Sequence, residues 1–165
     1  MNVVLYMATT VNGYIAKKDG ETSWSDEEWK SFSAMVERSG NLVIGRKTFE
    51  VMTTNDEFRK LGNPYVLVVS HIAKQQANFV LSPEDAIALL KEKGFSTVLV
   101  GGGSELNSSF MRKGLIDEIY VDIEPFLFGT GIKLFAEDTF ERQLRLLDSK
   151  KLSEHTLQLH YEIIK

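Results

Sequence analysis

Three consecutive glycines, Gly101 to Gly103, stand where the chain could bind a phosphate. They follow the apolar run 97–100 and precede a helical pattern that opens with Ser104, Glu105 and Leu106. Glycine lets the backbone approach a ligand and adopt positive φ. The first turn of a helix adds unpaired N–H groups and the positive end of the helix dipole. The segment is therefore either a phosphate-binding turn or a plain strand-to-helix connection, because lone glycine motifs are weak signals.

Two other apolar runs, 41–44 and 64–69, also end in groups that could bind an anion. Ligands of open α/β sheets bind at the carboxyl ends of the strands. Each positive charge at these ends is, taken alone, more typical of a solvated surface, but together, at equivalent ends of neighbouring strands, they predict a site for a polyanion. The residues at these two ends are Gly45, Arg46, Lys47, Thr48, Ser70 and His71.

Several other kinds of chemistry have no support in the sequence. The chain lacks cysteine, which rules out disulfides, thiolate nucleophiles and Cys-ligated zinc. Its three histidines are scattered, so no metal site is expected. Leu106 breaks the G-x-G-x-x-G spacing, and neither a P-loop nor a serine nucleophile elbow is present. The net charge of −4 argues against a nucleic-acid partner.

The order of the elements predicts a single α/β domain over residues 1–165. Strands and helices alternate and then only strands follow, which indicates a mostly parallel central sheet with helices on both faces. A C-terminal antiparallel hairpin, 144–152 with 155–164, is expected at the sheet edge. No apolar run is long enough for a membrane span and the N-terminus lacks a signal-peptide layout, so we expect a cytoplasmic protein without a membrane partner.

Local signals refine this outline. The run 2–8 reads as a central strand that is buried on both faces. Ser25 and Glu28 form a capping-box pattern at the start of a helix that ends at Gly40. Residues 53–63 read as irregular, and the strand 117–124 alternates apolar residues with polar ones that face solvent or a pocket. The segment 9–22 either folds over a pocket or forms a hairpin through its Asn-Gly pair.

Several segments together resemble the dihydrofolate reductase-like superfamily, and most closely the C-terminal reductase domain of the riboflavin-biosynthesis deaminase/reductase. The segments are 7–16, 45–50, 68–70, 100–103, 117–118, 125–131 and 134–135, so the resemblance covers essentially the whole chain. It implies an NADPH-dependent reductase that transfers a hydride to a C=N or C=O carbon of a small heterocycle, such as 5-amino-6-(5-phosphoribosylamino)uracil. It also implies a homodimer.

The resemblance further implies roles for single residues around NADPH. The turn at Arg46 and the turn at Ser70 would hold the 2′-phosphate and nearby phosphates. The triple glycine would hold the pyrophosphate, often with a cis peptide between its first two glycines. The segment 9–15 would cover the nicotinamide. The implied cofactor-binding residues are Ala8, Ile15, Gly45, Arg46, Lys47, Thr48, Ser70, His71, Gly101, Gly102, Gly103, Ser104, Glu105 and Leu106.

The substrate side is implied less directly. In dihydrofolate reductases a carboxylate early in the first helix binds the pterin ring, and Asp26 is the nearest match. An acid at a helix start is equally explained by the helix dipole. Thr10 and Asn12 are the other candidate catalytic residues, although relatives often have aspartate at the position of Asn12. A dihydrofolate or pterin reductase and a non-catalytic nucleotide-binding protein stay open as alternatives, because a fold does not fix a function.

Overall fold

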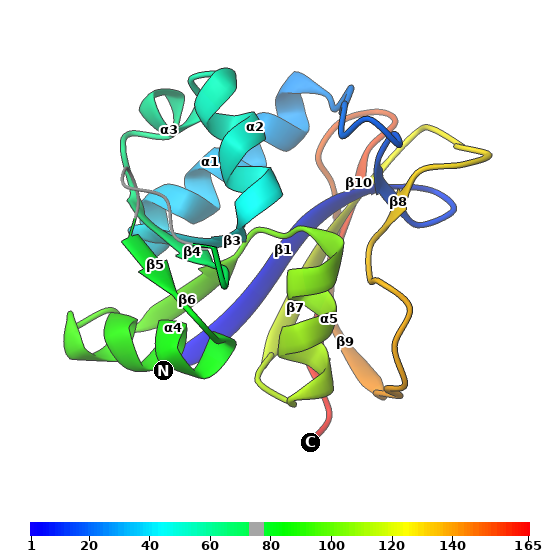
Figure 1. The fold of residues 1–165 in the computed structure, drawn as a ribbon. Helices are drawn as coiled ribbons and strands as arrows, with labels where there is room; N and C mark the ends of the chain where they lie inside the picture. Colours follow the sequence, from blue (N-terminus) through cyan, green and yellow to red (C-terminus); the bar gives the residue numbers. More distant parts are fainter. Residues whose placement is uncertain (73–77) are drawn as a thin grey trace.

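The computed structural model describes residues 1–72 and 78–165, which form one α/β domain (Figure 1). Its elements are β1 (Asn2–Thr10), β2 (Tyr14–Ala16), α1 (Asp26–Ser39), β3 (Asn41–Gly45), α2 (Arg46–Thr54), α3 (Glu57–Lys60), β4 (Tyr65–Val69), β5 (Asn78–Val80), α4 (Pro83–Glu92), β6 (Thr97–Val100), α5 (Ser104–Arg112), β7 (Glu118–Glu124), β8 (Ile132–Lys133), β9 (Leu144–Lys151) and β10 (Leu157–Ile163).

The main sheet has eight strands in the order β5-β4-β3-β6-β1-β7-β10-β9. The pairings from β5 to β7 are parallel, and β10 pairs antiparallel with both β7 and β9. The predicted parallel sheet with an antiparallel hairpin at its edge is therefore confirmed. In Figure 1 the edge hairpin lies behind α5, away from α4.

Strand β1 lies in the middle of the sheet and contributes to a core on each face. Val3 and Leu5 pack into the cluster that contains residues of α4 and α5. Val4 and Tyr6 pack into the cluster that contains residues of α1 and α2. Successive side chains of a strand point to opposite faces, so β1 is buried on both sides and helices cover both faces of the sheet, as predicted.

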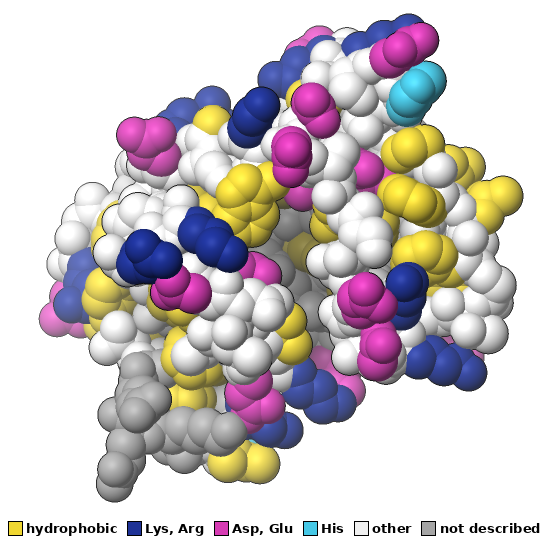
Figure 2. All heavy atoms as spheres, turned by 90° about the horizontal axis from the view of Figure 1, so that it is seen from above, with side chains coloured by type: hydrophobic (Ala, Val, Ile, Leu, Met, Phe, Trp, Pro, Cys, Tyr) yellow, Lys and Arg dark blue, Asp and Glu magenta, His cyan; other side chains and the backbone are white. Residues whose placement is uncertain are grey.

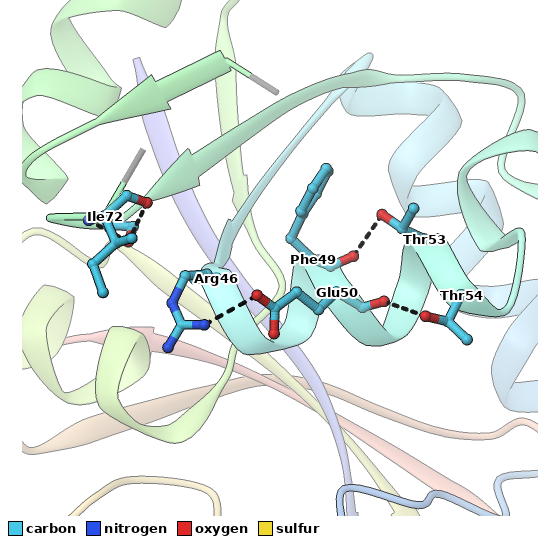
Figure 3. A network of polar contacts seen from close by, with 7 residues as sticks. Arg46, Phe49, Glu50, Thr53, Thr54 and Ile72 are labelled. Carbon is cyan, nitrogen blue, oxygen red and sulfur yellow. Dashed lines mark hydrogen bonds and ion pairs between the residues drawn. The ribbon is translucent and has the colours of Figure 1, made fainter. Parts of the chain in front are cut away.

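Two expectations on helices are corrected. Helix α2 continues through Thr54 because the hydroxyls of Thr53 and Thr54 donate to the carbonyls of Phe49 and Glu50, at 2.7 and 2.9 Å, inside the last turn (Figure 3). The segment expected to be irregular then forms α3, where Phe58 stacks on Phe49 with ring centroids 5.5 Å apart. Neither the last turn of α2 nor α3 has an apolar periodicity of its own, so the hydrophobic pattern of the sequence did not predict them.

The segment 9–22 was expected either to fold over a pocket or to form a hairpin through its Asn-Gly pair. Gly13 N donates to Thr10 O at 3.0 Å, so a turn forms at the Asn-Gly pair. The strand that follows it, β2, pairs antiparallel with β8 and not with β1. The hairpin is therefore wrong, and the segment instead joins the loops at the end of β7. Among the described residues, no helix combines the length and apolarity that a membrane span needs.

Candidate functional site

The carboxyl ends of the parallel strands open onto one face of the molecule. Figure 2 views this face from above Figure 1 and shows a hollow across its middle. The strands β4, β3, β6, β1 and β7 are consecutive neighbours in the sheet, so their ends lie in a row along this face. The predicted site residues follow these ends, and the hollow is where a ligand would enter.

The glycine turn lies directly beside Gly45. Gly45 N donates to Gly102 O at 2.8 Å, and Gly101 N donates to Val43 O at 2.9 Å. Gly45 is the N-cap of α2 and Gly103 is the N-cap of α5, and neither helix has a side-chain cap. Two helix N-termini with open first-turn N–H groups therefore lie next to each other, which is an arrangement suited to an anion.

The glycines allow this close packing. A Cβ on Gly101 would lie 2.7 Å from Leu42 Cδ1, and one on Gly102 would lie 3.1 Å from Met7 Sδ. Gly102 also has a φ of 92°, which favours glycine. One detail differs from the expectation: the cis peptide joins Gly102 and Gly103, the second and third glycines, instead of the first two.

Arg46 and Lys47 occupy the first turn of α2, which carries no acidic residue. Arg46 Nη1 donates to Glu50 Oε1 at 3.0 Å, and the Arg46 side chain remains 31% exposed (Figure 3). The guanidinium has five N–H groups, so this ion pair leaves donors for a second anion. Lys47 is exposed. Both positive charges lie at the positive end of the helix dipole, where an anionic ligand would neutralise them.

The remaining predicted cofactor residues differ in what they offer. Ser70 follows β4, whose Val69 pairs with Gly45, but its hydroxyl is engaged by the backbone of Ile72. His71 and Glu105 are exposed, and Thr48 and Ser104 are half-buried at the two helix starts. Ala8, Ile15 and Leu106 are buried, and Leu106 belongs to the core. The structure thus brings the two glycine segments together, whereas Leu106 can act on a ligand only through its backbone.

Thr10 and Asn12 hold the loop after β1 in place. Thr10 Oγ1 donates to Asn12 Oδ1 at 2.8 Å and accepts from Tyr14 N at 3.0 Å. The Asn12 amide donates to Phe128 O at 2.7 Å and accepts from Phe128 N at 3.2 Å. Phe128 in turn lies nearly parallel to Trp24, with centroids 6.3 Å apart. Both polar residues therefore position the loops beside the hollow.

A second part of the site consists of three buried acids, Glu28, Asp122 and Glu124. Asp122 accepts from Tyr6 Oη at 2.5 Å and from Gln158 Nε2 at 2.7 Å. Glu124 accepts from the N–H of Ser25 at 3.2 Å and from its hydroxyl at 2.7 Å. Because Glu124 takes the Ser25 N–H, the reciprocal half of the predicted capping box does not form, although Ser25 Oγ does accept from Glu28 N.

Burial and the repulsion between neighbouring carboxylates raise the pKa of two of these acids, Glu28 and Asp122. Burial, then Asp122 and then Glu124, raises the pKa of Glu28 to about 8. Burial also raises the pKa of Asp122 to about 6, against the opposing effect of the Tyr6 and Gln158 hydrogen bonds. Burial, followed by the nearby Asp122 charge, raises the pKa of Tyr6 far above its ordinary value, so Tyr6 stays a donor. Glu28 can therefore offer a proton near neutral pH.

The acid of α1 that belongs to this cluster is Glu28 and not Asp26. Asp26 is exposed in the first turn of the helix, whereas Glu28 is 5% exposed. Two residues correspond to about 200° around a helix, so the two side chains point in nearly opposite directions. The sequence does contain a signal for Glu28: it precedes Phe32 and Met35 by four and seven residues, on the apolar side of the helix.

Comparisons with known proteins agree with this architecture. The family model of the RibD C-terminal domain matches residues 1–158. The uncharacterized protein YwjB of Bacillus subtilis is 33% identical over 168 residues, which cover 96% of this chain and 95% of YwjB. A crystal structure from Shewanella sp. PV-4, named for riboflavin biosynthesis, is 27% identical with a TM-score of 0.85 and full coverage of both chains.

Two more distant structures share the fold. One is the Thermotoga maritima diaminohydroxyphosphoribosylaminopyrimidine deaminase/5-amino-6-(5-phosphoribosylamino)uracil reductase, 18% identical with a TM-score of 0.76, which covers 99% of this chain and 56% of that one. The other is the dihydrofolate reductase of Enterococcus faecalis complexed with NADP(H), 20% identical with a TM-score of 0.75 and coverage of 99% and 97%. Since a family model spans nearly all of the chain and a full-length relative is 33% identical, the protein belongs to the RibD C-terminal domain family and has the dihydrofolate reductase-like fold.

Proposed function

We propose that the protein is an NADPH-dependent reductase of a small heterocyclic substrate. The observation that carries this proposal is the pair of adjacent helix N-termini, at Gly45 and Gly103, joined by the Gly45–Gly102 hydrogen bond. Family membership supports an oxidoreductase in general, and one neighbour with the same fold was crystallised with NADP(H).

The residues present fit such a cofactor. The open N–H groups of α2 and α5 are donors for a pyrophosphate, and Arg46 and Lys47 supply positive charge for a 2′-phosphate. When bound, NADPH supplies the hydride. The loop that Thr10 and Asn12 hold in place would cover the nicotinamide, and Glu28 would face the ring of the substrate.

Cofactor binding is the direct test. Titration with NADPH and with NADH, followed by quenching of tryptophan fluorescence, should give at least tenfold tighter binding of NADPH, because charge-assisted contacts to the 2′-phosphate are strong ones. Absence of NADPH binding would contradict the proposal. Equal affinity for the two cofactors would show that Arg46 and Lys47 do not bind a 2′-phosphate.

Reduction of dihydrofolate or a pterin is a second candidate, and one observation favours it. Glu28 is a buried acid in the first turn of the first helix, where the resemblance implies a pterin-binding carboxylate. NADPH oxidation should be followed in parallel with dihydrofolate and with 5-amino-6-(5-phosphoribosylamino)uracil. Turnover of one compound identifies the substrate class. Tight NADPH binding with no turnover of either would favour a nucleotide-binding protein without this activity.

A further inference from the structure

Helix α5 carries a polar stripe that faces the protein and not the solvent. Ser104, Asn107 and Ser108 stand at positions i, i+3 and i+4, so their side chains share one face of the helix. Asn107 is fully buried and Ser108 is 3% exposed, and buried polar groups need hydrogen-bond partners. Asn107 Nδ2 donates to Leu134 O at 2.8 Å, and Ser108 Oγ donates to Ala136 O at 3.0 Å. Ala136 N donates back to Ser104 O at 3.3 Å, so three hydrogen bonds fix the segment after β8 on α5.

The same segment binds the loop that follows β1. Leu134 N donates to Gly13 O at 2.9 Å, and β8, which directly precedes Leu134, pairs with β2. Figure 1 shows β8 beside the loop that follows β1. The two segments are in close contact, because a Cβ on Gly131 would lie 2.5 Å from Ala16 O. Leu134 therefore joins two parts of the site: its N–H binds the loop after β1, and its C=O binds α5.

Asn107 lies one helical turn after the glycine turn. Its backbone N–H donates to Gly103 O at 2.9 Å and so closes the first turn of α5. Its Oδ1 has no hydrogen-bond partner among the residues that the structure describes, and a Cβ on Gly102 would lie 4.0 Å from this oxygen. A buried acceptor without a partner is unfavourable, and an apolar side chain would avoid that cost. Packing alone therefore does not explain an asparagine here, whereas the hydrogen bond to Leu134 does.

We propose that Asn107 is a positioning residue that fixes the loop after β1 relative to the glycine turn, so that both ends of one dinucleotide are bound at once. This inference rests on the proposed function, in which the glycine turn holds the pyrophosphate and the segment 9–15 covers the nicotinamide. Three hydrogen bonds in series connect the two parts: Gly103 to Asn107, Asn107 to Leu134, and Leu134 to Gly13. Loss of the Asn107 amide breaks the series in its middle and leaves the N-terminus of α2, with its two cations, in place.

Binding of a whole dinucleotide and of half of one separates this role from a purely structural one. Adenosine 2′,5′-bisphosphate has the 2′-phosphate and one phosphate of the pyrophosphate but no nicotinamide. In calorimetric titrations, Asn107→Ala should weaken NADPH binding about fivefold, as for the loss of one hydrogen bond, and change the affinity for the bisphosphate by less than about twofold. An equal loss for both ligands, or no loss for NADPH, overturns the role of Asn107. Absence of NADPH binding by the unmodified protein would instead contradict the proposed function, and the inference with it.

Arg112→Ala is the matched control. Arg112 also joins α5 to the chain beyond β8, because its Nη1 lies 2.6 Å from Asp138 Oδ2. It stands in the last turn of the helix, away from the glycine turn, and its side chain is 54% exposed. Arg112→Ala should therefore bind both ligands like the unmodified protein, and a loss of NADPH affinity equal to that of Asn107→Ala would overturn the proposal.

Hydrogen exchange on the unmodified protein decides the proposal even if Asn107→Ala fails to fold. Adenosine 2′,5′-bisphosphate has no nicotinamide to contact the loop after β1, so its effect there must pass through contacts within the chain. It should slow exchange of the Leu134 N–H, which is bound to Gly13 O, by about threefold or more. The Leu152 N–H, bound to Thr156 O between β9 and β10, is the internal control and should not change. Unchanged exchange at Leu134 with the bisphosphate bound overturns the proposal.

Discussion

At the scale of single residues, Glu28 links the site to the stability of the whole chain. An acid whose pKa is higher in the folded state than in the unfolded state holds a proton that unfolding releases. The folded-state pKa is about 8 and the ordinary value is 4.5, so Glu28 lowers the free energy of unfolding as the pH rises between these two values. Below pH 4.5 and above pH 8, Glu28 no longer makes the free energy of unfolding depend on pH.

Replacing Glu28 with glutamine should remove this pH dependence. In urea unfolding, ionisation of Glu28 should lower the free energy of unfolding of the unmodified protein by roughly 3 kcal/mol between pH 5 and pH 8. Glu28→Gln should retain that stability at pH 8, because an amide does not ionise. Glu27→Gln is the matched control and should follow the unmodified protein. A Glu28→Gln curve that still falls from pH 6 to pH 8 would contradict the assignment.

Arg46 should determine the preference for the phosphorylated cofactor. Arg46→Ala removes a partly exposed guanidinium from the first turn of α2. We expect NADPH affinity to fall by about 2 kcal/mol, as for the loss of one charge-assisted contact, and NADH affinity to change little. Fluorescence titration measures both. Lys60→Ala is a control at an exposed cation of α3, and an equal loss for both cofactors in Arg46→Ala would argue against a 2′-phosphate contact.

Single residues also differ in how far the sequence predicts their place in the site. The glycines and the Arg-Lys pair could be recognised because they stand at the ends of apolar runs. The buried acid could not be distinguished from the exposed one by residue type: Asp26 and Glu28 are both acids in a first helical turn, and only the helix rotation separates them. Asp122 and Glu124 were expected on the polar side of their strand, but the packing of α1 turns that side into a buried surface.

At the scale of elements, the glycine turn is fixed by its contacts with β3. Leu42 is fully buried, and a methyl group on Gly101 would overlap its Cδ1 at 2.7 Å and press on Ile44 Cγ2 at 3.4 Å. The position of the two helix N-termini therefore depends on a residue that has no side chain. The loops beside the hollow are fixed in another way, by side-chain hydrogen bonds from Asn12 to Phe128.

Gly101→Ala should destabilise the protein by about 1–3 kcal/mol, the range for overpacking a well-filled core. It should also weaken NADPH binding, because the N-termini of α2 and α5 would move apart. Gly129→Ala is the control: a methyl group there meets no atom within 4 Å. Urea unfolding of both variants measures the difference. Equal stability of the two would show that Leu42 moves aside without cost.

Elements with strong local patterns were predictable, and elements that depend on distant partners were not. Helices α1 and α4 begin directly after their N-cap residues, Ser25 and Ser82, as their sequences indicate. Strand β2 has three residues and its partner β8 has two. Strands this short show no alternation of apolar and polar residues that could predict them. The Asn-Gly pair before β2 therefore suggested a hairpin between β1 and the residues that follow it.

At the scale of the whole molecule, the family resemblance implies a homodimer, and the sheet edge offers an apolar surface for one. All eight residues of β9 are exposed. Leu144 and Leu146 pair with Ile163 and Tyr161 of β10, so they share a face with Leu157. These three leucines are 40%, 53% and 38% exposed. An edge strand with such a face is a ready site for a second copy.

Sedimentation velocity tests the dimer. We expect a species of twice the chain mass of 18.7 kDa, and Leu146→Lys should shift it to the monomer, because a buried unpaired ammonium is unfavourable. Leu127→Lys, at a 72% exposed loop residue, should leave the mass unchanged. A single monomeric species at all protein concentrations would contradict the expected homodimer.

The central place of β1 has a consequence for how the chain is made. Asn2 pairs with Thr97 of β6, and Val4 pairs with Glu118 of β7. Strand β1 therefore leaves the ribosome before both of its neighbours in the sheet, and it stays unpaired until β6 has been synthesised. Loop closure over such distances slows folding, and an apolar strand without partners invites aggregation meanwhile. Yield in cells should thus depend on chaperones that shield the nascent strand β1 more than on the stability of the finished domain.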